Sequence, residues 1–125
     1  MNEKRKFQRF SVQLNAFYSC DEGASLQPCT ITDISREGTK LELRTSEKIN
    51  QGARVNLVIQ LPGKAESIKC VLLLQWIEKK KTQAAVYFSC GGHFKLITRE
   101  DKWLLLEYAF DRWKKNESHK RNAAS

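Results

Sequence analysis

The sequence predicts a mainly β protein: a small six-stranded antiparallel barrel with one C-terminal α-helix packed on it. Three observations support this prediction. Short segments alternate apolar and polar residues with a period of two, as half-buried strands do. Turn residues such as Pro62-Gly63 separate these segments. Over residues 99–115 the apolar spacing changes to three and four, which indicates a helix.

The six strands are expected within residues 11–97. They cover residues 12–18, 29–35, 39–43, 55–61, 68–76 and 84–88, and the last is expected to end before Gly91-Gly92. The fifth strand is apolar on both faces, because Val71 and Leu73 lie between apolar residues of the other face. A strand with two apolar faces is normally covered on both, so we expect another element to cover this one.

A helix over residues 98–115 is the natural cover. Thr98 is a suitable N-cap, and Asp101 follows three residues later in the position of a capping box. Four apolar residues share one helical face and are expected to pack on the barrel: Trp103, Leu106, Phe110 and Trp113. Residues 116–125 are polar, and we expect a disordered tail there.

The chain of 125 residues is expected to form one domain with its own core. It has no apolar run long enough to span a membrane and begins with polar residues. We therefore expect no membrane insertion and a cytoplasmic location. The four cysteines are scattered without a Cys-x-x-Cys pair, which is typical of buried apolar positions, so we expect no metal and no cofactor.

The net charge of +8 favours an anionic partner. Four basic residues crowd the start of the chain: Lys4, Arg5, Lys6 and Arg9. Because these charges repel one another and few of the side chains can be buried, residues 1–10 are expected to be a flexible arm. A second basic cluster near the C-terminus is interpreted as a solvated surface.

Two motifs carry the chemistry of the chain. The arm contains Arg5-Lys6-Phe7-Gln8-Arg9, an Arg-x-x-x-Arg, which is a weak signal when taken alone. Residues 33–38 read Asp-Ile-Ser-Arg-Glu-Gly, a rarer Asp-x-Ser-x-x-Gly that closes the second predicted strand. Ile31 shares the strand parity of Asp33, which a bulge or an edge position would explain.

Together and in these places, the two motifs resemble the PilZ family of cyclic di-GMP receptors. The resemblance extends to Gly52-Ala53-Arg54-Val55 and to Val86-Tyr87-Phe88. It implies a barrel that binds cyclic di-GMP through five positions: Arg5, Arg9, Asp33, Ser35 and Gly38. Some members of the family carry a further arginine where this chain has Lys4, and that arginine is linked to a second ligand copy, so one or two ligands per chain stay open.

The chemistry of these residues suits the same ligand. Guanidinium groups bind phosphate in bidentate fashion and also match the O6 and N7 atoms of guanine. Asp33 can accept hydrogen bonds from N1 and N2 of guanine, Ser35 is small and can hydrogen-bond, and Gly38 supplies a positive φ or a close backbone approach. Three further cations are assigned an auxiliary role: Lys4, Lys6 and Arg36.

We therefore expect a cyclic di-GMP receptor that changes its N-terminal arm on binding and signals to a separate, unidentified protein. Motility and biofilm outputs are common for the family. We do not expect an enzyme, because His93 and His119 are isolated and no nucleophile–base pair stands out. Two alternatives stay open: a PilZ-like interaction scaffold without ligand, and a small-barrel nucleic-acid-binding protein. The second ranks lower because the aromatic residues fall largely on inward or helix positions.

Overall fold

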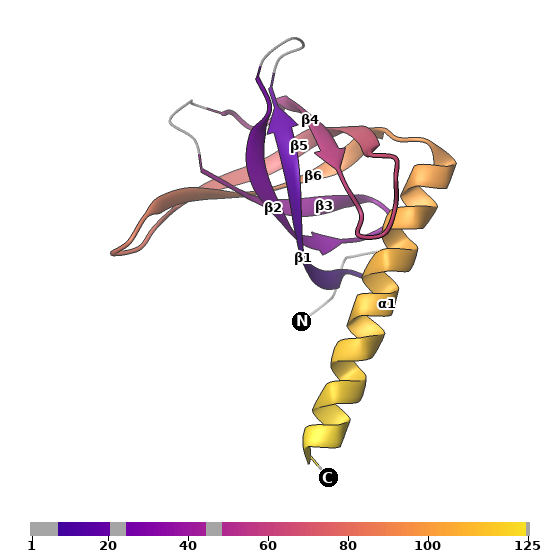
Figure 1. Ribbon diagram of the computed structural model, residues 1–125. Coiled ribbons are helices and arrows are strands. Elements are labelled where there is room, and N and C mark those ends of the chain that lie inside the picture. The colour runs from indigo at the N-terminus through magenta and orange to yellow at the C-terminus, as the bar shows by residue number, and fades with distance from the viewer. Residues whose placement is uncertain (1–7, 21–24, 45–48, 125) are drawn as a thin grey trace.

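The computed structural model describes residues 8–20, 25–44 and 49–124, with side chains up to Asn116. Within these residues six strands are followed by one helix (Figure 1). The elements are β1 (Phe10–Ser19), β2 (Gln27–Ile34), β3 (Gly38–Leu43), β4 (Arg54–Ile59), β5 (Ile68–Lys81), β6 (Val86–Leu96) and α1 (Arg99–Ala124). Neighbouring strands run antiparallel and close into a barrel in the order β1-β2-β3-β6-β5-β4. The predicted six-stranded barrel with a C-terminal helix is confirmed.

The barrel interior is filled by the apolar residues of the alternating pattern. Ile31, Leu41, Val55 and Leu72 come from four different strands, and each is 0% exposed. A barrel of this size has room inside only for its own side chains. A ligand therefore has to bind at the rim or on the outer surface.

Strand β6 is longer than predicted, because it runs through Gly91-Gly92 to Leu96. A Cβ atom on Gly91 would lie 2.5 Å from Nε1 of Trp76, and one on Gly92 would lie 2.7 Å from the carbonyl oxygen of Leu73. The two glycines therefore allow close contact between β6 and β5 and do not end the strand. The predicted end before them is wrong, since crowding by a distant strand leaves no mark on the local sequence.

Helix α1 begins where the capping pattern places it but ends later than predicted. The backbone amide of Asp101 donates a hydrogen bond to Oγ1 of Thr98 at 3.1 Å, which confirms the N-cap. The helix continues past Lys115 to Ala124, where a tail was expected. Residues 116–124 contain no proline or glycine that would stop it.

The far end of α1 projects beyond the barrel (Figure 1). The helix is too polar to cross a membrane, and the described ranges contain no other helix.

Helix α1 packs on the barrel only in part through the predicted residues: Leu106 packs against the core, and Phe110 and Trp113 contact Phe10 of β1. Leu105 and Ala109 are 1% and 0% exposed and join the core, whereas Trp103 and Phe110 are 67% and 43% exposed. The 3.6-residue period identifies the apolar positions of a helix but not which flank meets the barrel. The helix packs mainly on β1 and β2, so it does not cover the second face of β5, where Val71 stays partly exposed.

Three of the four cysteines are buried, as the scattered pattern predicts. They are Cys29, Cys70 and Cys90, and all are free thiols. Burial raises the pKa of each of the three to about 12. These thiols therefore stay protonated and unreactive at neutral pH.

Candidate functional site

The Asp-x-Ser-x-x-Gly motif forms the turn between β2 and β3, which we call the motif turn (residues 33–38). The backbone amide of Ser35 donates to the carbonyl oxygen of Gly38 at 2.9 Å. The hydroxyl oxygen of Ser35 accepts from the amides of Glu37 and Gly38, at 3.2 and 3.3 Å. Ser35 is only 2% exposed. Its hydroxyl therefore fixes the shape of the turn from inside.

Gly38 allows β3 to approach β6 closely at the end of this turn. Its φ is not positive, since Gly52 and Gly63 are the glycines in the described ranges with that conformation. A Cβ atom at Gly38 would lie 1.8 Å from the carbonyl oxygen of Gly92. The sequence left two roles open for Gly38, a positive φ or a close backbone approach. The structure shows the close approach, between β3 and β6.

A β-bulge turns Asp33 to the surface. The pairing of β2 with β3 shifts between Ile31 and Asp33, and the pairing of β1 with β2 shifts between Ser11 and Leu14. Ile31 and Ile34 are both buried, at 0% and 1% exposure, although they lie three residues apart. In a regular strand Ile31 and Asp33 would point to the same face. The bulge explains why Ile31 is buried while Asp33 lies half-buried at the barrel surface.

Asp33 forms an ion pair with Arg9, the second arginine of the arm. Nη1 of Arg9 lies 2.7 Å from Oδ1 of Asp33, and the two side chains are 27% and 17% exposed. This contact joins two motifs that lie 24 residues apart. The fold therefore brings one motif arginine onto the motif turn, while Arg5, Lys4 and Lys6 lie outside the described residues.

The ion pair leaves hydrogen-bonding groups of both side chains unused. A guanidinium carries five N–H donors, and a carboxylate has two acceptor oxygens. One donor and one oxygen are used in this contact, and both side chains remain in reach of solvent. The remaining groups suit a phosphate on the arginine side and the N–H edge of a purine on the carboxylate side.

A hollow lies beside the motif turn, and of the residues that line it only Arg36 belongs to a motif. We call it the basic pocket: it has a volume of about 490 Å³ and is lined by Arg36, Ile97, Arg99, Lys102, Trp103 and Leu106. The four helical members follow the spacing i, i+3, i+4 and i+7, which is one face of a helix. That spacing was a signal for this pocket, but the sequence does not show that Arg36 lies beside the same face.

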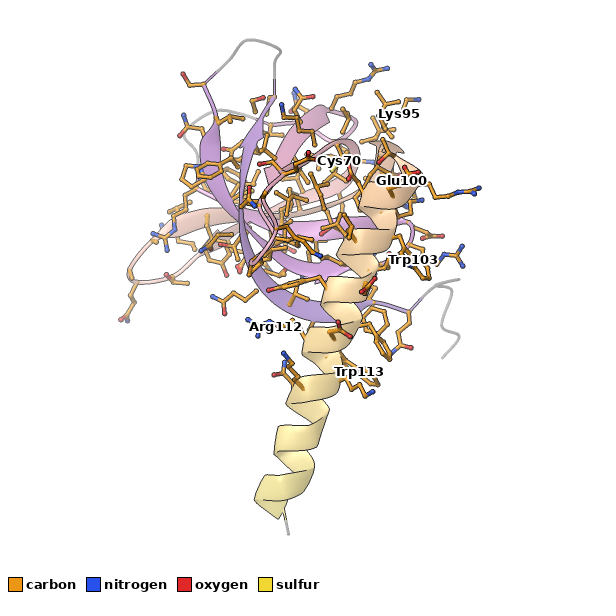
Figure 2. All side chains as sticks on the ribbon, turned by 45° about the vertical axis from the view of Figure 1, so that its right-hand side comes forward. Cys70, Lys95, Glu100, Trp103, Arg112 and Trp113 are labelled. Atoms are coloured by element: carbon orange, nitrogen blue, oxygen red, sulfur yellow. The ribbon has the colours of Figure 1, made fainter. Side chains whose placement is uncertain are left out.

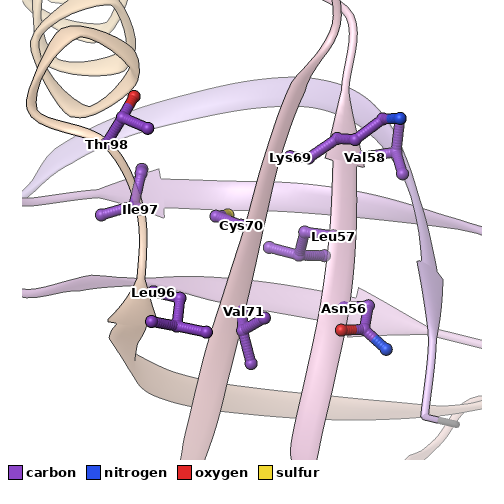
Figure 3. Close-up of a pocket in the computed structure, with 9 residues that line it drawn as sticks. All are labelled: Asn56, Leu57, Val58, Lys69, Cys70, Val71, Leu96, Ile97 and Thr98. Carbon is purple, nitrogen blue, oxygen red and sulfur yellow. The ribbon is translucent and has the colours of Figure 1, made fainter. Parts of the chain in front are cut away.

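Two other hollows contain no motif residue. One of about 470 Å³ is lined mainly by apolar residues of β4, β5, the end of β6 and the β6–α1 connection, including Val71 and Leu96 (Figure 3). The other, about 800 Å³, is a groove lined by residues of β1, β2 and β3 and of the β5–β6 hairpin. In the described ranges, no group of three or more His, Cys, Asp or Glu side chains is arranged to hold a metal ion.

The aromatic residues of the strands are more exposed than predicted. Phe17 on β1 is 48% exposed and Trp76 on β5 is 38% exposed. Phe17 lines the 800 Å³ groove, which does not include Trp76. The Nζ atom of Lys40 lies 5.8 Å from the centroid of the Trp76 ring. The two rings therefore do not share a pocket that would stack successive bases.

These features define a class of protein: a small closed barrel in which an arginine just before the first strand pairs with an Asp-x-Ser-x-x-Gly turn. The family model of the PilZ domain matches residues 3–111, so the chain belongs to the PilZ family. Curated protein sequences contain no match to it.

Solved structures of PilZ proteins share the fold. The PilZ domain of YcgR from Escherichia coli, solved with c-di-GMP, has a TM-score of 0.72 at 14% identity, over 96% of this chain and 98% of that one. The Bacillus subtilis inhibitor of motility, MotI/DgrA, has a TM-score of 0.70 at 18% identity, over 89% of this chain. The c-di-GMP complex of MrkH from K. pneumonia has a TM-score of 0.68 at 17% identity, over 91% of this chain. The matched regions cover 51% of MotI/DgrA and 56% of MrkH, about half of each.

Proposed function

We propose that this chain is a receptor for cyclic di-GMP, with a binding and not a catalytic function. The observation that carries the proposal is the 2.7 Å ion pair between Arg9 and Asp33. It holds an arm arginine on the motif turn, where phosphate and guanine groups of one ligand can be bound together. Membership of the PilZ family supports this ligand, as do the c-di-GMP complexes of the YcgR domain and MrkH.

The five motif residues divide into two roles in this proposal. Arg5 and Arg9 bind phosphate and the guanine O6 and N7 atoms, and Asp33 accepts hydrogen bonds from the guanine N–H edge. Ser35 and Gly38 act indirectly, because the first is buried within the turn and the second permits the contact of β3 with β6. They keep Asp33 in place for the ligand.

Binding is proposed to act as a switch on the N-terminal arm. Phosphate oxygens bind the donors of Arg9 that Asp33 does not use, so the ligand changes the charge around Arg9 and with it the path of the arm next to β1. The ring of Phe10, which follows Arg9, packs on Phe110 and Trp113 of α1, with centroid distances of 5.9 and 5.8 Å. A change at Arg9 is thereby passed to α1, and we propose that a separate protein partner responds to that surface.

Isothermal titration of cyclic di-GMP into the purified chain tests the proposal. We expect saturable binding that GTP does not displace. Arg9→Ala and Asp33→Ala should each raise the dissociation constant about ten- to a hundredfold, since a hydrogen bond to a charged group contributes about 1.5–3 kcal/mol.

Arg44→Ala is the matched control, because it removes an exposed arginine that lies outside the motif turn. Titration of a single-stranded oligonucleotide tests the nucleic-acid alternative. Absence of heat with cyclic di-GMP, or equal affinity in Asp33→Ala, would overturn the receptor proposal. Oligonucleotide binding that weakens steeply with salt would replace it.

A further inference from the structure

The basic pocket has the composition of a nucleotide site. Three cations, Arg36, Arg99 and Lys102, surround a hollow of about 490 Å³ together with Trp103, and its described lining contains no carboxylate side chain. An anion in this hollow would be attracted by all three cations. The lining thus combines groups for a phosphate with a ring for a base.

Trp103 is the aromatic member of this pocket. It is 67% exposed, the highest value among the large hydrophobic side chains that the structure describes. It lies on the same side of α1 as Trp113, whereas Arg112 points to the other side (Figure 2). An exposed indole offers a flat face on which a purine can stack, and such stacking contributes about 1–3 kcal/mol per base.

The basic pocket is physically joined to the motif turn. Arg36 belongs to both. The backbone amide of Phe94 donates to the carbonyl oxygen of Glu37 at 2.8 Å, which ties β6 to the turn. The Nζ atom of Lys102 lies 5.9 Å from the centroid of the Phe94 ring, which ties α1 to β6. The turn, β6 and the first turns of α1 therefore form one connected wall.

We infer that the ligand site extends along this wall, and that the basic pocket binds a second phosphate-and-guanine unit. Arg36, Arg99 and Lys102 bind the phosphate, and the guanine stacks on Trp103. The unit is either the far half of the dinucleotide held at Arg9 and Asp33 or part of a second copy. The inference rests on the proposed receptor function and adds residues that neither motif contains.

Titration of cyclic di-GMP into four variants tests the inference: Arg99→Ala/Lys102→Ala, Trp103→Ala, Trp103→Phe and the control Lys115→Ala. Lys115 is an exposed lysine of α1 outside the pocket. Removal of the two cations, or of the indole, should weaken binding about tenfold or more. Trp103→Phe keeps a stacking ring and should bind like the wild type, as should Lys115→Ala. The change in tryptophan emission on binding should shrink in Trp103→Phe, although its affinity is kept.

The stoichiometry identifies the source of the unit. A weaker dissociation constant with an unchanged number of ligands indicates the far half of one ligand, whereas loss of one of two ligands indicates a second copy. Wild-type affinity and stoichiometry in both Arg99→Ala/Lys102→Ala and Trp103→Ala, with binding lost in Arg9→Ala, would overturn this inference alone. Failure of the wild-type chain to bind would overturn the receptor proposal and this inference with it. Circular dichroism of each variant verifies that the fold is kept.

Discussion

At the scale of single residues, the motif turn separates the residue that we propose to meet the ligand from the residues that hold the turn. Asp33 reaches the surface through a bulge and pairs with Arg9. Ser35 is buried, and its hydroxyl oxygen accepts two backbone hydrogen bonds within the turn. A buried hydroxyl with these partners is expensive to remove, because the amides of Glu37 and Gly38 would lose their acceptor. Within the motif, Ser35 therefore has a structural role, whereas Asp33 is the residue proposed to contact the ligand.

Gly38→Ala should be strongly destabilising. The added Cβ would lie 1.8 Å from the carbonyl oxygen of Gly92, so β3 and β6 would have to separate. We expect a loss of about 2–4 kcal/mol in the free energy of unfolding, as for other overpacking changes with backbone shifts. Urea denaturation followed by circular dichroism measures it.

Gly63→Ala provides the matched control for this prediction. A Cβ there meets nothing within 4 Å, although φ is +79°. The strain of a left-handed alanine should cost about 1–2 kcal/mol. A Gly38→Ala variant that loses no more stability than Gly63→Ala would contradict the close-approach role.

At the scale of elements, α1 connects the core of the barrel to the candidate site. One face places Leu105 and Ala109 in the core, and the neighbouring face carries Trp103 beside the motif turn and Phe110 beside Phe10. The helix is thus fixed mainly by its buried face, while Trp103 remains exposed beside the motif turn.

This division predicts effects of very different size for two substitutions on α1. Leu105→Ala should lower the free energy of unfolding by about 2–5 kcal/mol, because it removes a buried side chain and leaves a cavity. Trp103→Ala should change it by less than about 1 kcal/mol, because the side chain is largely exposed. Thermal or urea unfolding of the two variants measures the difference. Equal losses, or a larger loss for Trp103→Ala, would show that the aromatic face holds the helix on the barrel.

At the scale of the whole molecule, the sequence was sufficient for the barrel and for identifying the two motifs that contain Arg9 and Asp33, but not for the ion pair between these residues without ligand. A strand with one buried face alternates apolar and polar residues, and this alternation can be read directly from the sequence. The features that it missed depend on contacts between distant segments. Gly91-Gly92 has the sequence of a turn, but Trp76 and Leu73 of β5 lie too close to allow side chains there. The basic pocket forms only because Arg36 lies beside the first turns of α1. The two buried residues of α1, Leu105 and Ala109, were missed for the same reason.

The central claim is that cyclic di-GMP binds at the motif turn and the arm beside it. The most direct test is a ¹H–¹⁵N correlation spectrum of the labelled chain recorded as cyclic di-GMP is added. We predict that the largest chemical-shift changes fall on the amides of Arg9, of residues 33–38 and of Phe94, which donates a hydrogen bond to the carbonyl oxygen of Glu37. An unchanged spectrum, or changes confined to the apolar hollow around Val71 and Leu96 (Figure 3), would contradict the claim.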